Sequence, residues 1–323
     1  FDVPFVFLYE IFRGFARMYG RMQYADYLVS YALQTLNRCL LKVAANEALT
    51  DKDERLFLEQ IAHLESIWQM LQWSVGKVVH EQASERLREI SGLVPAPNPE
   101  LQAAAQLLEY SHDKVQSTLV AVAAQASLPE LAPWLERRER LSTLLQEESA
   151  CWRDYLPLRR VPEAELVEHG MARAYVKAEK LSRRLDAASN ADQEPAGPKR
   201  LVRTHRWIGH AANHLDLIRG VLDDSALSQR WHLRRLHGKV EQQLGLELFT
   251  RRAVEIDMKA KARHRLELLL ATQRRHLDKQ RRKLTEGAFL LSPEDYVAQV
   301  AGCVEELGLQ KITLLPVDTG EQA

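Results

Sequence analysis

The sequence predicts an all-α fold, and two observations lead to that class. Nearly every long segment repeats its apolar residues with the 3.6-residue period of a helix, and no alternation typical of half-buried strands persists. The segments are separated by loop-like stretches rich in proline, glycine or asparagine, namely "GLVPAPNPE", "SLPELAP", "DYLPLRRVP" and "ASNADQEPAGP". The tail "ITLLPVDTGEQA" is expected to form a short strand or no regular element.

The periodicity predicts helices at residues 5–18, 24–46, 52–75, 80–92, 99–126, 134–150, 163–187, 199–222, 226–246, 258–285 and 293–307. Start signals support three of them. Asp51 and Glu54 have the spacing of a capping box. Pro162 followed by Glu163 suits a first helical turn, where proline leaves no N–H unbonded and acidic groups are favoured. The "SPE" at residues 292–294 is a start of the same kind.

An internal repeat indicates how the helices are organised. "ADYLVSYALQTLNRCLLKVAANEALTDKDERLFLEQIAHLESIWQML" and "GMARAYVKAEKLSRRLDAASNADQEPAGPKRLVRTHRWIGHAANHLDLI" each predict a long helix, a polar loop and a long helix. A further helix follows each of them, in "SERLREISGLV" and "SQRWHLRRLHGKV". We therefore expect a duplicated pair of helical bundles, two halves of roughly four helices related by pseudo-two-fold symmetry. The expected domains are residues 1–156, the first repeat, and residues 157–323, the basic second repeat with the tail.

Composition favours a globular chain with a substantial core. Of the 323 residues, 46% are hydrophobic and 27% are charged, which argues against disorder and against a collagen-like chain. The three cysteines, Cys39, Cys151 and Cys303, are too far apart in sequence for a disulfide framework or a metal-binding motif. This usage favours a reducing compartment, and we expect a cytoplasmic protein.

The first residues predict no integral membrane segment. "VPFVFLYEIF" is too short to span a bilayer, and no cleavage-site pattern accompanies it. "FRGFARMYGRMQY" mixes arginine with aromatic residues, which leaves two interpretations. It is either a contact with a membrane surface or, as we favour, part of a first helix that packs its aromatic side chains into the domain.

The formal net charge of zero conceals a strong asymmetry. Residues 157–290 contain 28 Lys and Arg against 17 Asp and Glu, whereas the rest of the chain contains 16 against 27. The basic region is therefore the candidate for binding a polyanion.

The segment "LVRTHRWIGHAANHLDLIRGVL", residues 201–222, extends a basic stripe that begins at Lys199 and flanks an apolar helix face. Its members are three or four residues apart, so successive ones are neighbours on the helix, and the preceding and following helices carry similar stripes. A linear polyanion repeats its phosphates every few ångströms and therefore suits a row of donors. The candidate polyanion-binding residues are Arg173, Lys177, Lys180, Lys199, Arg203, Arg206, His210, His214, Arg230, Arg234 and His237.

Simpler interpretations exist for these residues. Each stripe alone is typical of a solvated helix face. His210 and His214 are either neutral core residues or members of the binding stripe, and in the second case affinity should rise as the pH falls through the histidine range. Their i, i+4 spacing also occurs in metal sites. The helix offers no carboxylate or cysteine at a matching place, however, so we expect no metal and no cofactor.

Residues 171–253 resemble the CHAD domain, the conserved histidine α-helical domain. The resemblance rests on "ARAYVKAEKLSRRL", a loop, "RLVRTHRWIGHAANHLDLI" and "RWHLRRLHGKVEQQLGLELFTRRA", and residues 25–110 look faintly like the family's first half. It implies a duplicated all-α fold that binds inorganic polyphosphate through basic helices. The family pattern, roughly H-x-x-R-K-x-x-K, falls on Val202, His205, Arg206 and Gly209. Of these, only Arg206 keeps its charge type.

No motif of an enzyme is present. The sequence lacks GxxxxGK[ST], GxGxxG after a strand and the GxSxG elbow. The acid pairs at residues 147–148 and 223–224 are expected to be capping or solvated groups. We therefore predict a protein that is not an enzyme.

Three functions are compatible with these observations. The first is non-enzymatic binding of inorganic polyphosphate or a similar polyanion through the basic stripes. The alternative is a divergent α-helical scaffold or protein-interaction module that has lost polyanion binding. The third is a nucleic-acid binder, which the scarcity of aromatic stacking residues near the stripes disfavours.

Overall fold

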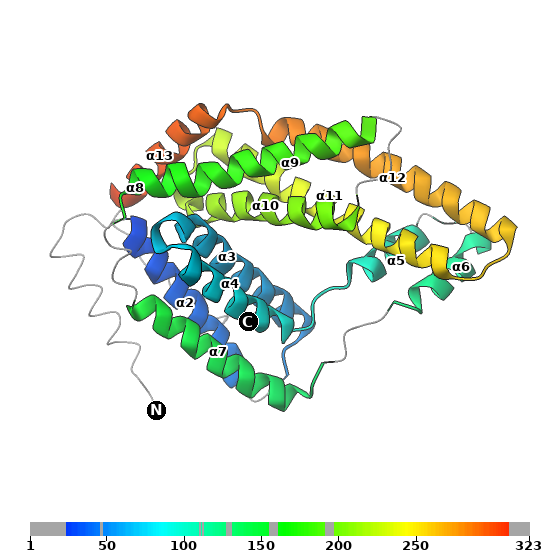
Figure 1. The fold of residues 1–323 in the computed structure, drawn as a ribbon, viewed down its shortest axis with the longest axis horizontal. Coiled ribbons are helices and arrows are strands. Elements are labelled where there is room, and N and C mark those ends of the chain that lie inside the picture. The colour runs from blue at the N-terminus through cyan, green and yellow to red at the C-terminus, as the bar shows by residue number, and fades with distance from the viewer. Residues whose placement is uncertain are drawn as a thin grey trace, which may run out of the picture.

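The computed structural model shows an all-helical protein, which confirms the predicted fold class for the part of the chain that it describes (Figure 1). It describes residues 24–45, 48–109, 111, 113–126, 131–154, 161–190 and 197–309, and these residues contain no strand. The predicted helix over residues 5–18 and the C-terminal tail lie outside the described residues. No helix of the described ranges has the length and apolarity that a membrane crossing requires.

The described elements, in chain order, are α2 (Tyr24–Ala44), α3 (Asp51–Val75), α4 (Lys77–Gly92), α5 (Pro99–Glu109), α6 (Asp113–Ala123), α7 (Trp134–Asp154), α8 (Glu163–Glu165), the π-helical turn η2 (Leu166–Met171), α9 (Ala172–Asn190), α10 (Pro198–Leu217), the 3₁₀ turn η3 (Arg219–Val221), α11 (Asp224–Glu255), α12 (Ala260–Ala288) and α13 (Pro293–Leu309). Most predicted bounds hold within a few residues. The helix predicted over residues 99–126 forms two helices instead. The helix predicted to end at residue 246 continues to Glu255, because Gly245 packs against Pro99 of α5 and does not terminate α11.

The start of α3 differs by one residue from the predicted capping box. Thr50 is the cap: its hydroxyl accepts from the N–H of Asp53 (3.2 Å), and the Asp53 carboxylate accepts from the N–H of Thr50 (3.4 Å). Hydrogen bonds from Lys42 and Thr50 lower the pKa of Asp53 to about 2. Thr50 has the extended backbone that a cap requires, whereas Asp51 is already helical.

The helices form two groups that pack against each other (Figure 1). Helices α2, α3, α4 and α7 pack on one another, and helices α9, α10, α11 and α12 form the other group, with α13 against α9. Helices α5 and α6 belong to the N-terminal part of the sequence but pack on α11 and α12. The two groups join mainly where α3 lies against α10 and against η2, and α13 also contacts α2.

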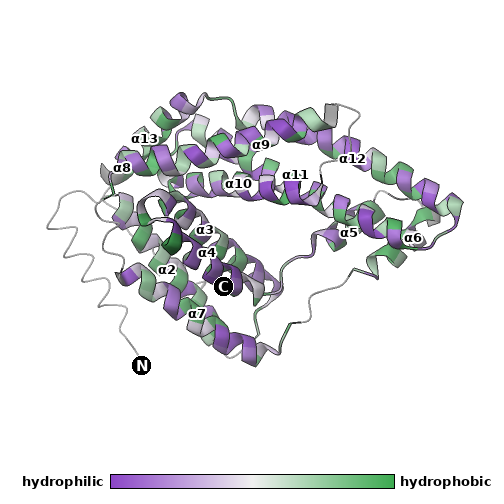
Figure 2. Ribbon diagram, in the orientation of Figure 1, coloured by the Kyte–Doolittle hydropathy of each residue, from purple (hydrophilic) through white to green (hydrophobic). Residues whose placement is uncertain are grey.

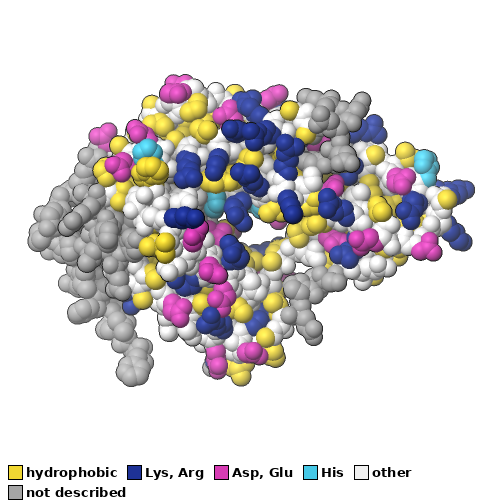
Figure 3. Space-filling view, in the orientation of Figure 1, with side chains coloured by type: hydrophobic (Ala, Val, Ile, Leu, Met, Phe, Trp, Pro, Cys, Tyr) yellow, Lys and Arg dark blue, Asp and Glu magenta, His cyan; other side chains and the backbone are white. Residues whose placement is uncertain are grey.

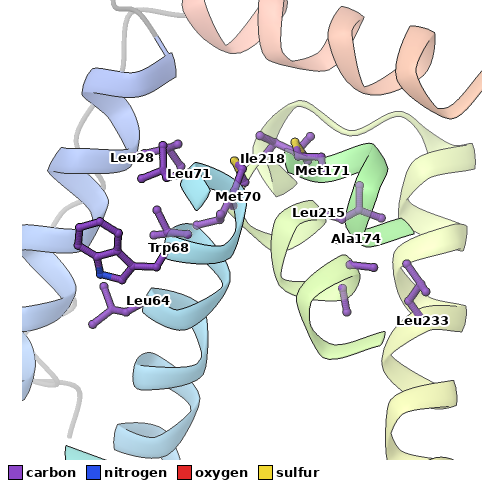
Figure 4. Close-up of a cluster of buried hydrophobic side chains, with 14 of the residues drawn as sticks. Leu28, Leu64, Trp68, Met70, Leu71, Met171, Ala174, Leu215, Ile218 and Leu233 are labelled. Atoms are coloured by element: carbon purple, nitrogen blue, oxygen red, sulfur yellow. The ribbon is translucent and has the colours of Figure 1, made fainter. Parts of the chain in front are cut away.

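The hydrophobic core crosses from one group to the other. The helices carry both hydrophilic and hydrophobic residues, as elements with one buried face require (Figure 2). In the close-up, Trp68 and Leu71 point to the side of Leu28, and Met70 points to the side of Met171 and Ile218 (Figure 4). A second, smaller core lies between α5, α6, α11 and α12. The larger core thus includes residues on both sides of position 156, and the division into domains 1–156 and 157–323 stays a prediction.

A buried carboxylate ties the first group together. Glu148 of α7 accepts hydrogen bonds from the Trp68 indole of α3 (2.6 Å), the Trp152 indole (2.8 Å) and Arg86 Nε of α4 (2.7 Å). The expectation that this acid is a capping or solvated group is therefore wrong. It lies one turn before Trp152 on the buried face of α7, and its three donors compensate for the loss of water.

Gly170 allows η2 to approach α3 closely. A Cβ at this position would meet the side chain of Met70 and would lie 2.8 Å from the Met70 carbonyl oxygen. Because the carbonyl belongs to the backbone of α3, it cannot move aside as the end of a flexible side chain would. The glycine is thus required by the contact that joins the two helix groups.

We expect Gly170→Ala to lower the free energy of unfolding by about 1–3 kcal/mol, the usual cost of overpacking. The matched control is Gly238→Ala, because nothing lies within 4 Å of a Cβ at Gly238 in α11. That change should stabilise the protein by up to about 1 kcal/mol through helix propensity. Urea denaturation of the two variants measures both effects, and equal stability of the Gly170 variant and the wild type would contradict the close contact.

Candidate functional site

The basic stripes of α9 and α10 face the same surface. The two helices pack side by side, and Lys177 Nζ of α9 lies 4.4 Å from the centroid of the Trp207 ring of α10. Burial lowers the pKa of Lys177, and the charges of Arg173 and Arg203 lower it further. Figure 3 shows Lys and Arg side chains gathered over α9 and α10. Two of the three predicted stripes, those of α9 and α10, therefore lie side by side.

The charges of Arg173 and Arg203 act on Lys177, and three further predicted cations, Lys180, Lys199 and Arg206, continue the same two rows of α9 and α10. We call these six residues the basic surface: Arg173, Lys177, Lys180, Lys199, Arg203 and Arg206. The first two are half-buried and the other four are exposed. Within the described part of the chain, none of the six makes a recorded ion pair with a carboxylate. Glu65 of α3 offsets part of the charge of Arg206. An anion bound among the six cations would relieve the repulsion that remains.

His210 and His214 lie inside the protein and not on the basic surface. His210 Nδ1 is 3.0 Å from Ser66 Oγ, and His214 Nε2 is 2.9 Å from the Ser66 carbonyl oxygen. Burial lowers the pKa of His210 to about 3 and that of His214 to about 4. The predicted stripe is thus corrected: its last two members are neutral core residues, because α10 crosses α3 at their position.

Arg230 and Arg234 of α11 are occupied by contacts within the fold. Both form ion pairs with Asp216 of α10. Arg234 Nη2 also donates to Asn213 Oδ1 (2.7 Å) and to His63 Nε2 (3.2 Å). The two arginines therefore hold α11 against α10 and do not extend the basic surface as predicted.

His237, the third predicted residue of α11, stacks on His205 of α10. The ring centroids are 3.7 Å apart and the planes differ by 25°. Burial holds the pKa of His237 well below its usual range, and burial lowers that of His205 to about 4. A Cβ at Gly209 would lie 3.0 Å from His237 Nε2, so the glycine leaves room for this ring. The stacked pair is part of the α10–α11 contact.

Two polar residues near the basic surface were not identified from the sequence. Gln69 of α3 is buried and makes no hydrogen bond to other described residues. His80 of α4 has a buried Nδ1 without a described partner, and its pKa is lowered by burial and by the charge of Arg173. Nothing in the periodicity of either helix distinguishes these residues from ordinary polar positions, because their environment depends on the crossing of α3 and α10.

Other candidate chemistry is weaker. A hollow of about 430 Å³ along α12 has mixed charges, being lined by Arg275, Asp278, Lys279, Arg282, Lys283 and Glu286. The described ranges contain no group of three or more His, Cys, Asp or Glu residues placed to hold a metal ion. Cys39 and Cys303 are buried, and Cys151 is half-buried.

Comparison with known proteins gives no relative: no family model, no curated protein and no solved structure matches the chain. The case for function therefore depends on the residues of the chain itself.

We expect acid to destabilise the protein through its buried histidines. Unfolded histidines bind protons below about pH 6.5, whereas folded His210 and His214 stay neutral down to about pH 3 and 4. Between these values the unfolded state binds more protons, so stability falls as the pH falls. With about 1.4 kcal/mol for each tenfold change in acidity constant, His214 alone contributes on the order of 3 kcal/mol to this loss.

Melting temperatures between pH 7.5 and pH 4.5 test this expectation. The His214→Gln variant retains a donor for the Ser66 carbonyl but does not titrate. It should melt at a lower temperature than the wild type at pH 7.5 and show a shallower decline toward pH 4.5. An equally steep decline in wild type and variant would show that His214 is not a source of the acid sensitivity.

Proposed function

We propose that the basic surface binds inorganic polyphosphate or a similar linear polyanion, without converting it. The observation that carries the proposal is the meeting of two cation rows on neighbouring helices with no recorded carboxylate partner among the described residues. Arginine and lysine donate to phosphate oxygens in strong charge-assisted hydrogen bonds. The crowding of like charges destabilises the free protein, and a bound anion offsets this repulsion.

The spacing of the cations favours a linear ligand over a compact one. Arg173, Lys177 and Lys180 are three or four residues apart on α9, so their positions along the helix differ by about 4.5–6 Å. Arg203 and Arg206 continue the same spacing on α10. A chain with a negative charge every few ångströms matches two such rows, whereas one small anion would use only part of them.

We also propose that the chain is a divergent member of the CHAD family with two duplicated halves. The support is the order of the packed helices: α2, α3 and α4 are followed by α7, and α9, α10 and α11 are followed by α12. The second long helix of each group, α3 or α10, provides the contact between the groups. In this proposal residues 1–156 and 157–323 are the two repeats, and α5 and α6 are an insertion in the first.

Superposing residues 24–92 on residues 172–240 tests whether the two helix groups are duplicated halves. A two-fold rotation about an axis between α3 and α10, with the helices in the same order and direction, supports it. If no single rotation overlays three helices of each group, the two groups are not repeats and the family proposal loses its architectural support.

The alternative function is a scaffold that has lost polyanion binding. A specific observation favours it: Arg230, Arg234, His210, His214 and His237 all serve internal contacts. Nucleic-acid binding remains third, because Lys177 lies over the ring of Trp207 and His210 meets that ring edge-on, which hinders base stacking.

A titration with long-chain polyphosphate distinguishes the first function from the scaffold. We expect binding at low salt that weakens steeply as salt rises. Arg203→Ala and Arg206→Ala should each weaken binding by about tenfold, because each removes a charge-assisted contact, and each should reduce the slope of log affinity against log salt by up to about one. The matched control is Arg55→Ala, which removes an exposed cation from the opposite end of α3 and should leave affinity unchanged. Absence of binding at low salt would exclude the proposal.

A further inference from the structure

The buried amide of Gln69 is the starting point. Its side chain is 5% exposed, and neither its oxygen nor its nitrogen has a hydrogen-bond partner in the described part of the chain. An unpaired buried amide is costly, and folded proteins retain few of them without a reason. A ligand that pairs both atoms would be such a reason.

The crossing of α3 and α10 fixes the position of Gln69 along α10. Ser66 Oγ lies beside His210 (3.0 Å), and Ala62 O accepts from Asn213 Nδ2 (3.1 Å), so residue numbers rise on α3 as they fall on α10. Gln69 stands three residues after Ser66 and therefore shares its face of the helix. The antiparallel register places Gln69 level with the turn of α10 just before His210.

Helices α9 and α10 bring a cation each to this level. Glu65 stands four residues before Gln69 and shares its face of α3. Burial raises the pKa of Glu65, and the charge of Arg206 opposes that rise. Gly170 of η2 lies against Met70, the residue next to Gln69, and Arg173 follows three residues later. Arg206 of α10 and Arg173 near the start of α9 therefore lie close to the level of Gln69 along α3.

His80 completes the arrangement from α4. The charge of Arg173 lowers the pKa of His80. The charges of His80 and Arg206 in turn both lower the pKa of His210. The buried Nδ1 of His80 has no described partner. The register of α3 on α10 and these charge effects indicate that two cations, an unpaired amide and an unpaired imidazole nitrogen lie near one another at the edge of the basic surface.

We propose that Gln69, His80, Arg173 and Arg206 bind the terminal phosphate of the polyanion chain, so that the protein recognises a chain end. This inference rests on the proposed function and adds to it: the basic surface holds the body of the chain, and these four residues hold its end.

The hydrogen-bonding capacity of Gln69 distinguishes an end from the middle of the chain. Arginine only donates, whereas the amide has two N–H donors and an oxygen that must accept. The internal phosphates of a linear polyphosphate carry oxygens that only accept. A terminal phosphate, with its second ionisation near pH 6–7, as is usual for such groups, retains a hydroxyl in part of the population that can donate to the Gln69 oxygen or to His80. A terminal phosphate can therefore pair both atoms of the amide by itself, whereas an internal phosphate can pair only its N–H groups.

Calorimetric titration with two ligands tests this recognition: long-chain polyphosphate with free ends, and the same polymer with both ends capped as N,N-dialkyl phosphoramidates, which carry no O–H or N–H donor. Wild type should bind the free-ended polymer about tenfold more tightly, as expected for one or two buried hydrogen bonds. Gln69→Leu should lose this preference while its affinity for the capped polymer is unchanged. Gln69→Glu should weaken binding of the free-ended polymer further by repulsion. The control is Gln82→Leu on the exposed face of α4, which should retain the wild-type preference.

The stability of Gln69→Leu gives a second readout. In phosphate-free buffer the variant should melt above the wild type, because it removes an unpaired amide and retains the apolar bulk. A lower melting temperature would show that the amide serves the fold and would overturn the inference. Equal affinity of the wild type for capped and free-ended polymer would also overturn it, yet leave the proposed function intact. If the wild type binds neither polymer at low salt, the proposed function fails and the inference fails with it.

Discussion

The hydrogen bonds around Ser66, at the crossing of α3 and α10, are the constraint on which the rest of the structure depends. The Ser66 hydroxyl donates to the Ala62 carbonyl (2.8 Å) and accepts from Asn213 Nδ2 (2.8 Å). Since its proton is used, its contact with His210 Nδ1 requires that nitrogen to be the donor. His214 donates through Nε2 to the Ser66 carbonyl. Burial lowers the pKa of both histidines and keeps both imidazoles neutral, so each has a defined tautomer. They join the two helix groups without placing a charge between them.

This crossing divides α10 into two functional parts. Beyond α3, the N-terminal half exposes Arg203 and Arg206, whose donors remain available to a ligand. The C-terminal half is buried, and there Asp216 binds Arg230 and Arg234, which keeps these two cations of α11 out of the basic surface. The same helix thus supplies free cations at one end and neutralises its neighbour's cations at the other.

The sequence predicts most of the helices and part of the candidate site, and the limits have a physical cause. Apolar periodicity finds most helices within a few residues, and it places Arg173, Lys177, Arg203 and Arg206 correctly on two stripes. A helical wheel gives directions around one helix but not the position of a crossing helix. It therefore does not show that α3 covers the stripe from His210 onward.

The buried acid and the unpaired amide were missed for the same reason. Glu148 looks like one of many acids of a polar helix until two indoles and an arginine from other elements surround it. Gln69 gains its significance only from the register of α3 on α10 and from the approach of η2 at Gly170. Each of these contacts joins residues far apart in sequence, and no local pattern encodes them.

The burial of the histidines determines how the basic surface responds to its surroundings. Burial is the largest cause of the low pKa of His210, and the charges of His214 and Arg206 come after it. A polyanion that neutralises Arg206 therefore removes only a smaller contribution, and His210 stays neutral in the complex at physiological pH. Lysine and arginine therefore supply the attraction for the polyanion, and they keep their charge throughout the pH range in which histidine titrates. The affinity of the basic surface for the body of the chain, which such groups govern, depends strongly on salt and weakly on pH. This is the opposite of the response expected if His210 and His214 faced the ligand.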